Sequence, residues 1–504
     1  MTWLHDLPRS HPDGDLAIID HDGTPVTFGA LRDAVNDLAR RLSDLGLRAG
    51  DRCMLICENS ATYAAAILAA SRLRVWILPV NGRQSQDEVE ALIAHAGPRL
   101  ILFTPEASPP ARDHAARLGA TSHGPMATGE LLVAGPFDGP GTAPEPVSDD
   151  PAQQVAALMY TTGTTSAPKG VMLTHANLVW NARVSARLRG MNPGDTVVGV
   201  LPGTHIFCFA SAFLASLAGG SAIRFIPRFS AAAVLDAFAK GDSVMPAVPQ
   251  MYQAILAELA RRGTKPDAPN LRYISSGGAP LDPEWKEKIE ATFGIPLQNG
   301  YGLTETSPGV SGTRLGDPRN DTSVGQILDD VDCLIDAPDQ DGVGELLIRG
   351  PNIMKGYYHN PEATAAAIRE DGYFRSGDLA KIDPDGTLWI MGRKKELIIR
   401  SGFNVFPPEV EAMLTRHPGV LQTAVVGRQV PGNEEILAFA TARPGVTEAD
   451  LKDFLKAHLV GYKVPQHVFI IEAFPAAATG KILKHKLVGT FADLIEARDR
   501  AKAS

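Results

Sequence analysis

Residues 155–170 read VAALMYTTGTTSAPKG, and this segment decides how the rest of the chain is interpreted. The apolar run Val155–Met159 predicts a buried strand, and the Gly/Thr-rich stretch Tyr160–Gly170 predicts a loop after it. Such a loop exposes backbone N–H groups and hydroxyls that can hold phosphate oxygens, and Lys169 adds a cation. It is not a Walker A loop, because no glycine directly precedes the lysine and Gly170, rather than Ser or Thr, follows it.

The segments around this loop alternate between strand and helix patterns. Predicted strands are Leu16–Asp20, Val26–Phe28, Cys53–Cys57, Val75–Val80 and Arg99–Thr104, and predicted helices include Thr62–Leu73 and a segment from the Ser85–Glu88 capping box to His95. Strands that alternate with helices indicate βαβ units and a mostly parallel sheet. The predicted fold class is therefore α/β.

Composition changes divide the chain. The Pro/Gly-rich, acidic stretch Pro136–Gln154 predicts a surface linker, after which the βα rhythm runs to about Ile348. A second change begins at Gly392 and predicts a hinge. We expect a large N-terminal domain of βα-layered sheets at 1–393 and a small α+β domain at 394–504.

Composition also excludes some classes of protein. With 48 Lys+Arg and 57 Asp+Glu the 504-residue chain carries a net charge of −9, which argues against nucleic-acid binding driven by overall charge. Four scattered cysteines are too few for a disulfide scaffold and fit a reduced cytoplasm. The first fifteen residues lack the apolar core of a signal peptide. The uncharged run Ile206–Ile223 is long enough to span a membrane, but its serines and Gly219-Gly220 predict a buried helix that ends at a glycine turn.

Further short motifs follow the loop in a fixed order. They are Leu201-Pro-Gly-Thr-His205, Ser275-Ser-Gly-Gly-Ala-Pro-Leu281, Asn299-Gly-Tyr-Gly-Leu-Thr-Glu305, Gly344-Glu-Leu-Leu-Ile-Arg-Gly350, Gly356-Tyr-Tyr358, Tyr373-Phe-Arg-Ser-Gly-Asp378, Gly392-Arg-Lys-Lys-Glu396, Ser401-Gly-Phe-Asn-Val-Phe-Pro407 and Ala478-Thr-Gly-Lys481. Together they resemble the adenylate-forming superfamily, which includes acyl- and aryl-CoA synthetases, luciferases and peptide-synthetase adenylation domains. The chain differs at Thr162 and Ser166, where the family usually has Ser and Gly.

The resemblance implies an AMP-forming acid:CoA ligase that works in two steps. A carboxylate attacks the α-phosphate of ATP and releases pyrophosphate, and the CoA thiol then attacks the acyl-adenylate. The implied ATP-binding residues are Thr161, Thr162, Gly163, Thr164, Thr165, Lys169, Ser276, Gly277, Gly278, Ala279, Pro280, Asn299, Gly300, Tyr301, Gly302, Thr304, Asp378 and Arg393. Tyr301 would stack on adenine, and Asp378 would accept hydrogen bonds from the ribose hydroxyls.

Catalysis in the first step is electrostatic, because both reactants are anions. The resemblance assigns Lys481 as the cation between carboxylate and α-phosphate, and Glu305 with Thr164 as the ligands of Mg²⁺, a hard cation that prefers oxygen. It makes His205 a gate that orients the acid. For the second step it makes Lys395 the pivot of the small domain and places Gly402 beside the pantetheine tunnel.

The acid is predicted from the segment after His205. Phe207, Phe209 and Phe213 indicate an apolar acyl pocket. The segment has no Asp to pair with an α-ammonium group and no Arg or Lys for a second carboxylate, which disfavours amino acids and dicarboxylates. Arg224 and Arg228 would change this if they pointed inward. A fatty or an aromatic acid remains, and with it a role in fatty acid metabolism.

Two other functions stay open at this point. The acyl group could pass to a carrier protein in trans instead of CoA, or the chain could be a nucleotide sensor without turnover. Lys169, Glu305, Asp378 and Lys481 together argue against a sensor. The expected partners are small molecules, namely the acid, ATP and CoA, and no nucleic acid. We expect no membrane-spanning segment, and a homodimer is compatible with the sequence.

Overall fold

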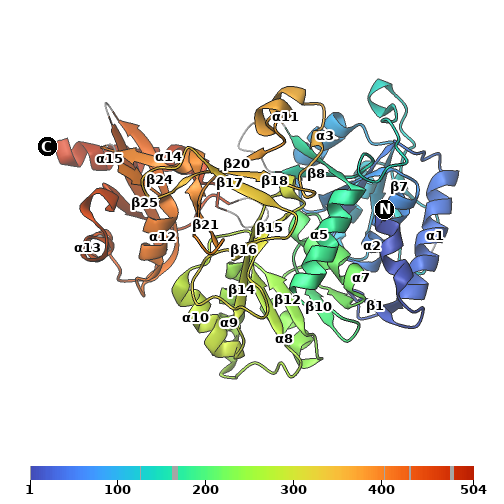
Figure 1. Cartoon of the computed structure of the whole chain (residues 1–504), viewed down its shortest axis with the longest axis horizontal. Coiled ribbons are helices and arrows are strands. Elements are labelled where there is room, and N and C mark those ends of the chain that lie inside the picture. The colour runs from blue at the N-terminus through green and yellow to red at the C-terminus, as the bar shows by residue number, and fades with distance from the viewer. Residues whose placement is uncertain are drawn as a thin grey trace. The chain divides into compact units, whose positions relative to one another are not determined.

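The computed structural model describes residues 2–124, 126–161, 168–401, 403–430, 433–476 and 482–503. The chain forms two compact units. Unit 1 consists of Met1–Leu334, Leu347–Arg375 and Pro384–Leu388, and unit 2 consists of Ile335–Leu346, Ser376–Asp383 and Trp389–Ser504. Figure 1 shows helices and strands mixed along the whole chain, which confirms the α/β fold class.

Unit 1 contains an eight-stranded sheet that carries the flanks of the Gly/Thr-rich loop. Its order is β19 (Gly356–Tyr357), β9 (Lys169–Thr174), β8 (Val155–Thr161), β4 (Trp76–Asn81), β3 (Arg52–Cys57), β5 (Leu100–Phe103), β7 (Leu132–Ala134) and β6 (Thr121–Ser122). The central strands β8, β4, β3 and β5 are parallel. Every residue of β3 is buried, as expected for a central parallel strand covered on both faces.

A nine-stranded sheet forms the other half of unit 1. Its order is β16 (Gln326–Ile327), β15 (Gly309–Gly312), β14 (Leu297–Gly302), β13 (Tyr273–Ser276), β12 (Val244–Ala247), β10 (Thr196–Gly199), β11 (Ala222–Phe225), β1 (Leu16–Ile19) and β2 (Pro25–Thr27). Strands β1, β11, β10, β12, β13 and β14 run parallel. Their carboxyl ends therefore meet at one edge of the sheet, where ligands bind in many α/β proteins.

Helices pack on these sheets in unit 1. They are α1 (Phe28–Asp44), α2 (Ala61–Arg72), α3 (Gln86–Ala96), α4 (Pro109–Arg117), α5 (His175–Leu188), α6 (Ile206–Cys208), α7 (Ala215–Gly219), α8 (Ala231–Ala239), α9 (Pro249–Arg262), α10 (Pro283–Phe293) and α11 (Pro361–Ala367), with the short turns η1 (Leu4–Ser10), η2 (Pro140–Thr142) and η4 (Thr304–Thr306). The predicted capping box at Ser85 and Glu88 is confirmed at the start of α3, and Gly97 ends that helix in a left-handed conformation.

The uncharged run after His205 is buried and ends at a glycine, as predicted. It is not one regular helix, because α6 passes into the π-helical segment η3 (Phe209–Leu214) before α7. Gly220 ends it with φ 72°, a left-handed conformation that glycine adopts without strain. Among the described residues, none of the helices combines the length and apolar character needed to traverse a bilayer.

The Pro/Gly-rich stretch Pro136–Gln154 is mostly exposed, and a buried arginine anchors it. Arg52, at the start of β3, is 1% exposed, and its guanidinium donates to the carbonyls of Gly141 and Ala143, both at 2.6 Å. The same group donates to the carbonyl of Ala96 at 2.8 Å. These bonds satisfy a buried cation and fix the stretch to the eight-stranded sheet.

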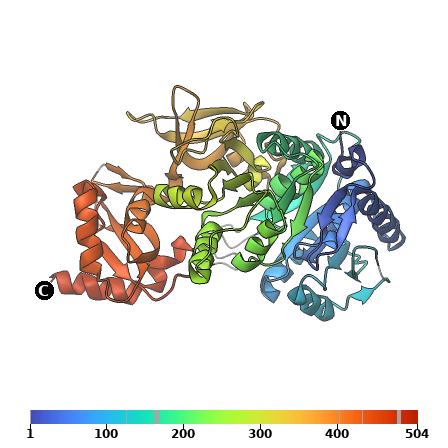
Figure 2. The same cartoon turned by 90° about the horizontal axis from the view of Figure 1, so that it is seen from below.

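Unit 2 has its own core. The antiparallel hairpin of β24 (Val420–Val430) and β25 (Asn433–Ala442) extends to the parallel strand β26 (His467–Ile470). Helices α12 (Pro407–Thr415) and α14 (Lys484–Thr490) contact β24, and α13 (Glu448–His458) contacts β26 (Figure 2). The unit also contains η5 (Lys394–Glu396), the hairpin β22 (Ile398–Arg400) and β23 (Phe403–Val405), η6 (Gly461–Lys463) and α15 (Ala492–Ala503). A further sheet has the order β17 (Asp332–Asp336), β18 (Gly344–Arg349), β20 (Phe374–Ile382) and β21 (Leu388–Arg393).

Candidate active site

The Gly/Thr-rich loop connects two neighbouring antiparallel strands. Thr161 at the end of β8 pairs with Lys169 at the start of β9, and Tyr160 pairs with Gly170. The sheet therefore fixes both ends of the loop. Thr162, Gly163, Thr164 and Thr165 lie outside the described residues.

Lys169, Tyr357 and Glu305 form a chain of contacts beside this loop. The Lys169 ammonium lies 5.4 Å from the centre of the Tyr357 ring, and the Tyr357 hydroxyl donates to Glu305 Oε1 at 2.9 Å. Burial and the neighbouring Glu305 raise the pKa of Tyr357, so the hydroxyl stays protonated and keeps donating. One phenol thus connects a predicted phosphate ligand to a predicted metal ligand.

A hydrogen bond also fixes the backbone at Glu305. Glu305 lies in η4, and its carbonyl accepts from the Met354 N–H at 2.9 Å. The carboxylate is only partly buried and supplies hard oxygen donors, so its chemistry fits Mg²⁺. When bound, that ion would neutralise charge on the phosphate oxygens.

Tyr160 is held from behind the loop. Its hydroxyl lies 2.8 Å from His95 Nδ1, and His95 also lies edge-on to Tyr358. Burial lowers the pKa of His95, and the nearby His359 lowers it further. A neutral His95 can accept from the Tyr160 hydroxyl, and this contact fixes the residue at which the loop begins.

The predicted adenine-side loop follows β13 at the carboxyl edge of the nine-stranded sheet. The Ser276 hydroxyl is buried and has no hydrogen-bond partner among the described residues. Gly278 has φ 75°, and the Gly277 N–H donates to the Ala247 carbonyl at 3.2 Å. With Ala279 and Pro280 this loop presents backbone and small side chains, so a flat ring could approach closely.

The neighbouring strand β14 carries the next predicted motif. Asn299 is buried, and its amide donates to the carbonyls of Thr322 and Ser323 at 3.1 and 3.0 Å. The Asn299 side chain therefore orients its own strand. A Cβ at Gly302 would lie 2.0 Å from the Pro308 carbonyl oxygen, so this position requires glycine. The remaining predicted residues of this motif are partly buried along or just after the same strand: Gly300, Tyr301 and Thr304.

The predicted acid-binding residues separate into two groups. His205 is exposed and caps α6, its Nδ1 accepting from the Phe207 N–H at 3.3 Å. Phe207 is half-buried and faces the adenine-side loop, since its ring would lie 3.2 Å from a Cβ at Gly277. Phe209 and Phe213 are fully buried, and the Phe213 ring packs against Tyr63 and Phe225.

The two arginines that could have received a second carboxylate are both in ion pairs. Arg224 donates to both oxygens of Asp242, at 2.7 and 2.8 Å. Arg228 Nε lies 3.4 Å from Glu58 Oε1, which also pairs with Arg83 at 3.1 Å. Arg224 thus has a counter-charge of its own, whereas Arg228, which is 54% exposed, shares the Glu58 carboxylate with Arg83.

Unit 2 brings the predicted ribose residues together. The Asp378 carboxylate is 3% exposed, and Arg393 Nε lies 2.8 Å from Asp378 Oδ1. Asp378 follows Gly377 within β20, and Gly377 has a left-handed φ of 70° inside this strand. Lys394 pairs with Glu345 at 2.8 Å, and the predicted pivot Lys395 is exposed in η5.

Lys481 and Gly402 lie outside the described residues, but the base of the Lys481 segment is well defined. Ala476 and Ile482 form an antiparallel bridge. Lys484 follows, and its ammonium pairs with Glu411 at 2.8 Å and Glu396 at 3.1 Å. Burial alone would lower the pKa of Lys484, but the two carboxylates outweigh it and raise the pKa, so Lys484 is a charged anchor.

Sequence reasoning missed Tyr357 and Lys484 as supports of the site. Tyr357 lies inside the motif Gly356-Tyr-Tyr358, so its position was visible but its contact with Glu305 was not. Lys484 follows the predicted catalytic lysine by three residues, and no motif marks its contacts with Glu396 and Glu411.

Family models and characterised relatives match most of the chain. The family model of AMP-binding enzymes matches residues 5–358, and that of the AMP-binding enzyme C-terminal domain matches 409–481. An oxalate–CoA ligase of Arabidopsis thaliana is 34% identical over 482 residues, covering 91% of this chain and 92% of that protein. A feruloyl-CoA synthase of an Amycolatopsis species is 33% identical, covering 92% and 94%.

Solved structures are similar over almost the whole chain. ATP-bound MatB from Rhodopseudomonas palustris has a TM-score of 0.84 at 28% identity, covering 97% of this chain and 99% of that chain. The o-succinylbenzoate CoA synthetase of Bacillus subtilis with ATP and magnesium ion has a TM-score of 0.81 at 26% identity, covering 96% and 98%.

The chain belongs to the AMP-binding enzyme family. Within that adenylate-forming family it is an AMP-forming acid:CoA ligase, which activates a carboxylic acid with ATP and transfers the acyl group to CoA. ATP, Mg²⁺ and CoA are its nucleotide, metal and thiol requirements.

Proposed function

We propose that the phosphate, metal and acid sites of this ligase lie in unit 1, with Lys169 on the phosphates and Glu305 and Thr164 on magnesium. The contact chain from Lys169 through Tyr357 to Glu305 carries the proposal, because it holds a cation and a carboxylate on two sides of one phenol. His205 orients the carboxylate of the acid. The acid is ionised near neutral pH, so the step needs charge neutralisation and alignment rather than a general base.

The proposal gives the second cation to the C-terminal segment. Lys481 neutralises the repulsion between the acid and the α-phosphate during adenylation and then withdraws. The domain boundary between 393 and 394, with Lys395 as its pivot, allows the small domain to rotate, and Gly402 lines the path of the thiol. A glycine suits that path because any side chain would narrow it.

We further propose that the acid is an apolar monocarboxylate, either fatty or aromatic. Phe207 supplies an apolar wall, and the ion pairs of Arg224 and Arg228 support the absence of a second carboxylate site. The names of relatives do not choose the acid, since they include both oxalate and ferulate at similar identity. The proposal also includes a cytoplasmic location and a homodimeric state. Light scattering on purified protein tests the dimer.

The direct test combines purified protein, ATP, Mg²⁺ and a panel of fatty, aromatic, dicarboxylic and amino acids with CoA or a holo-carrier protein. The expected result is thioester with CoA from a fatty or aromatic acid, with AMP and pyrophosphate as co-products. If thioester formed only on the carrier protein, the carrier rather than CoA would be the acyl acceptor. Preference for oxalate or another dicarboxylate would contradict the proposed acid class.

A further inference from the structure

Asn59 connects the two sheets of unit 1 through one buried amide. It follows β3 and is 1% exposed. Its Nδ2 donates to the carbonyls of Gly199 at 2.9 Å and Leu201 at 2.8 Å, and its Oδ1 accepts from the Gly203 N–H at 2.6 Å. The amide thus makes three hydrogen bonds to the backbone at the end of β10 and just after it, about 140 residues further along the chain.

Tyr63 holds the other side of the same backbone. Its ring is fully buried, and its hydroxyl donates to the Gly203 carbonyl at 2.7 Å. Burial raises the pKa of Tyr63 well above its ordinary value, so the hydroxyl remains a donor. Asn59 and Tyr63 therefore satisfy both polar backbone groups of Gly203.

Gly203 is enclosed by these two side chains. A Cβ at this position would lie 2.6 Å from Tyr63 Cζ and 2.8 Å from Asn59 Oδ1, closer than real Cβ contacts. The glycine is therefore required by the packing of Asn59 and Tyr63 around it. Any shift of either side chain would move the turn that begins here.

That turn leads directly to the residues of the proposed acid site. The His205 N–H donates to the Pro202 carbonyl at 2.9 Å, which closes the turn around Gly203. His205 Nδ1 then accepts from the Phe207 N–H. The orientations of His205 and Phe207 are thus set by a backbone segment that Asn59 and Tyr63 hold in place.

Asn59 itself is firmly fixed. The preceding Glu58 carboxylate is buried and pairs with Arg83 at 3.1 Å and Arg228 at 3.4 Å. The following Ser60 caps α2, its hydroxyl accepting from the Tyr63 N–H at 3.2 Å. A side chain anchored on both sides can transmit its position to the turn that it binds.

We infer that Asn59 and Tyr63 are positioning residues for acid activation, which hold the Gly203 turn so that His205 and Phe207 meet the carboxylate in a productive orientation. The inference rests on the proposed role of His205 and Phe207. Within the described part of the chain, neither side chain forms a hydrogen bond to a predicted nucleotide-binding residue. Their loss should therefore affect the acid far more than ATP.

The test measures acid-dependent ATP–pyrophosphate exchange while acid and ATP are varied separately. Tyr63→Phe removes one hydroxyl without opening a cavity and should raise the KM for the acid by about three- to tenfold. Asn59→Ala removes three hydrogen bonds and should raise it by more than about tenfold. For both variants the KM for ATP should stay within about twofold of the wild-type value, because the turn positions His205 and Phe207 and meets the adenine-side loop through the Phe207 ring.

Asn177→Ala is the matched control. Asn177 is also buried and also makes three bonds to backbone, accepting from Thr174 at 2.9 Å and donating to Pro351 at 2.7 Å and Ile353 at 3.0 Å. The Asn177→Ala variant should lose thermal stability without a selective change in the KM for the acid.

Three outcomes would overturn the inference. In the first, the Asn59 and Tyr63 variants lose stability as Asn177→Ala does and keep the wild-type KM for the acid. In the second, the KM for ATP rises as much as the KM for the acid. If Asn59→Ala fails to fold, Tyr63→Phe alone decides. In the third, wild-type protein shows no acid-dependent exchange with any acid, which would refute the proposed function and with it this inference.

Discussion

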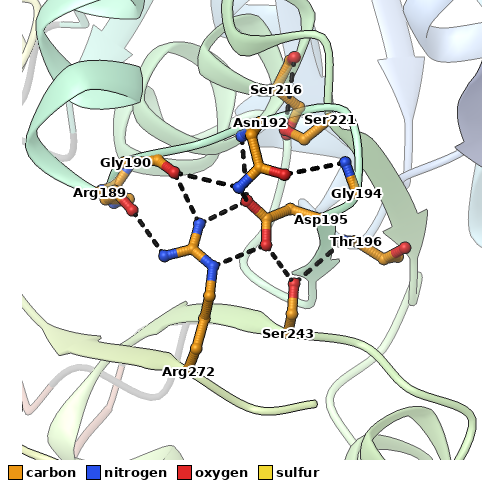
Figure 3. A network of polar contacts seen from close by, with 10 residues as sticks. All are labelled: Arg189, Gly190, Asn192, Gly194, Asp195, Thr196, Ser216, Ser221, Ser243 and Arg272. Carbon is orange, nitrogen blue, oxygen red and sulfur yellow. Dashed lines mark hydrogen bonds and ion pairs between the residues drawn. The ribbon is translucent and has the colours of Figure 1, made fainter.

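The two edges of the nine-stranded sheet are built in opposite ways. At the amino edge of β10, β12 and β13, three polar side chains each directly precede a strand: Asp195, Ser243 and Arg272. Figure 3 shows them converging into one network. At the carboxyl edge of the same sheet the loops carry glycines and backbone groups instead, as at Gly203 and Gly277. One edge satisfies its own charges, and the other presents groups that a ligand can use.

The closed edge is organised around Asp195. Arg272 Nε donates to Asp195 Oδ1 at 2.7 Å, and Ser243 donates to the same oxygen at 2.8 Å. Arg272 also donates to the Arg189 and Gly190 carbonyls at 3.0 and 2.9 Å. Burial alone would raise the pKa of Asp195, but the hydrogen bonds from Arg272 and Ser243 outweigh it and lower the pKa. Substitutions at this edge should therefore lower the free energy of unfolding, whereas substitutions at the open edge should lower the catalytic rate.

The largest expected effect is at the open edge, in Glu305→Gln. The amide keeps an oxygen for the Tyr357 hydroxyl but loses the charge that would hold magnesium, so adenylation should fall by about 10²–10³-fold. The free energy of unfolding should hardly change. Pyrophosphate exchange measured over a range of Mg²⁺ concentrations tests this, and activity within about threefold of wild type would refute the assignment.

Arg272→Met tests the closed edge. It leaves the buried Asp195 carboxylate without its cation, and we expect the free energy of unfolding to drop by about 2–3 kcal/mol. This is less than the loss expected for a fully buried ion pair, because Arg272 is 32% exposed. The KM values for acid and ATP of the folded variant should not change. Urea denaturation gives the first quantity and initial rates give the second. A selective change in either KM would break the distinction between the two edges.

The stability of the folded protein should depend on pH through the buried His175. Burial lowers the pKa of His175 to about 3, and the nearby His5 contributes, so the folded protein keeps His175 neutral. The unfolded chain binds a proton near pH 6.5, so stability should fall as the pH drops below that value, by about 2 kcal/mol at pH 5. His175→Gln should flatten this dependence in thermal melts, and an unchanged slope would contradict the buried neutral state.

The smallest expected effect sharpens the comparison between two adjacent tyrosines. Tyr357→Phe keeps the ring beside Lys169 but removes the donor to Glu305, and adenylation should slow by about three- to tenfold. Tyr358→Phe is the control, since its hydroxyl binds Glu145 at 2.7 Å, away from Glu305. Equal rate losses in the two variants would show that the contact with Glu305 carries no catalytic weight.

The sequence predicted the parts of this molecule that depend on local pattern. Apolar runs predicted strands such as β3 and β8, and the Ser85–Glu88 spacing predicted the start of α3. Small-residue motifs predicted the loops at the open edge, because glycine is required where backbones approach closely. Each of these signals lies within a few residues of the feature that it marks.

The contacts between distant segments could not be predicted in this way. Arg52, Asn59 and Arg272 all bind backbone carbonyls from remote parts of the chain, and a carbonyl has no sequence signature. The phenylalanines show the same limit. Spacing could not tell that Phe209 and Phe213 are fully buried while Phe207 faces the adenine-side loop, because the helix that carries Phe207 passes into a π-helical segment at Phe209, which changes the register.

In the proposed mechanism, Lys481 serves the first half-reaction and is dispensable for the second. The decisive measurement compares both half-reactions in Lys481→Ala, with Gly402→Leu as the reciprocal variant. We predict that adenylation in Lys481→Ala falls by more than about 10²-fold, while thioester formation from supplied acyl-adenylate stays within about threefold of wild type. Gly402→Leu should show the reverse pattern. Equal losses of both half-reactions in Lys481→Ala would contradict the account.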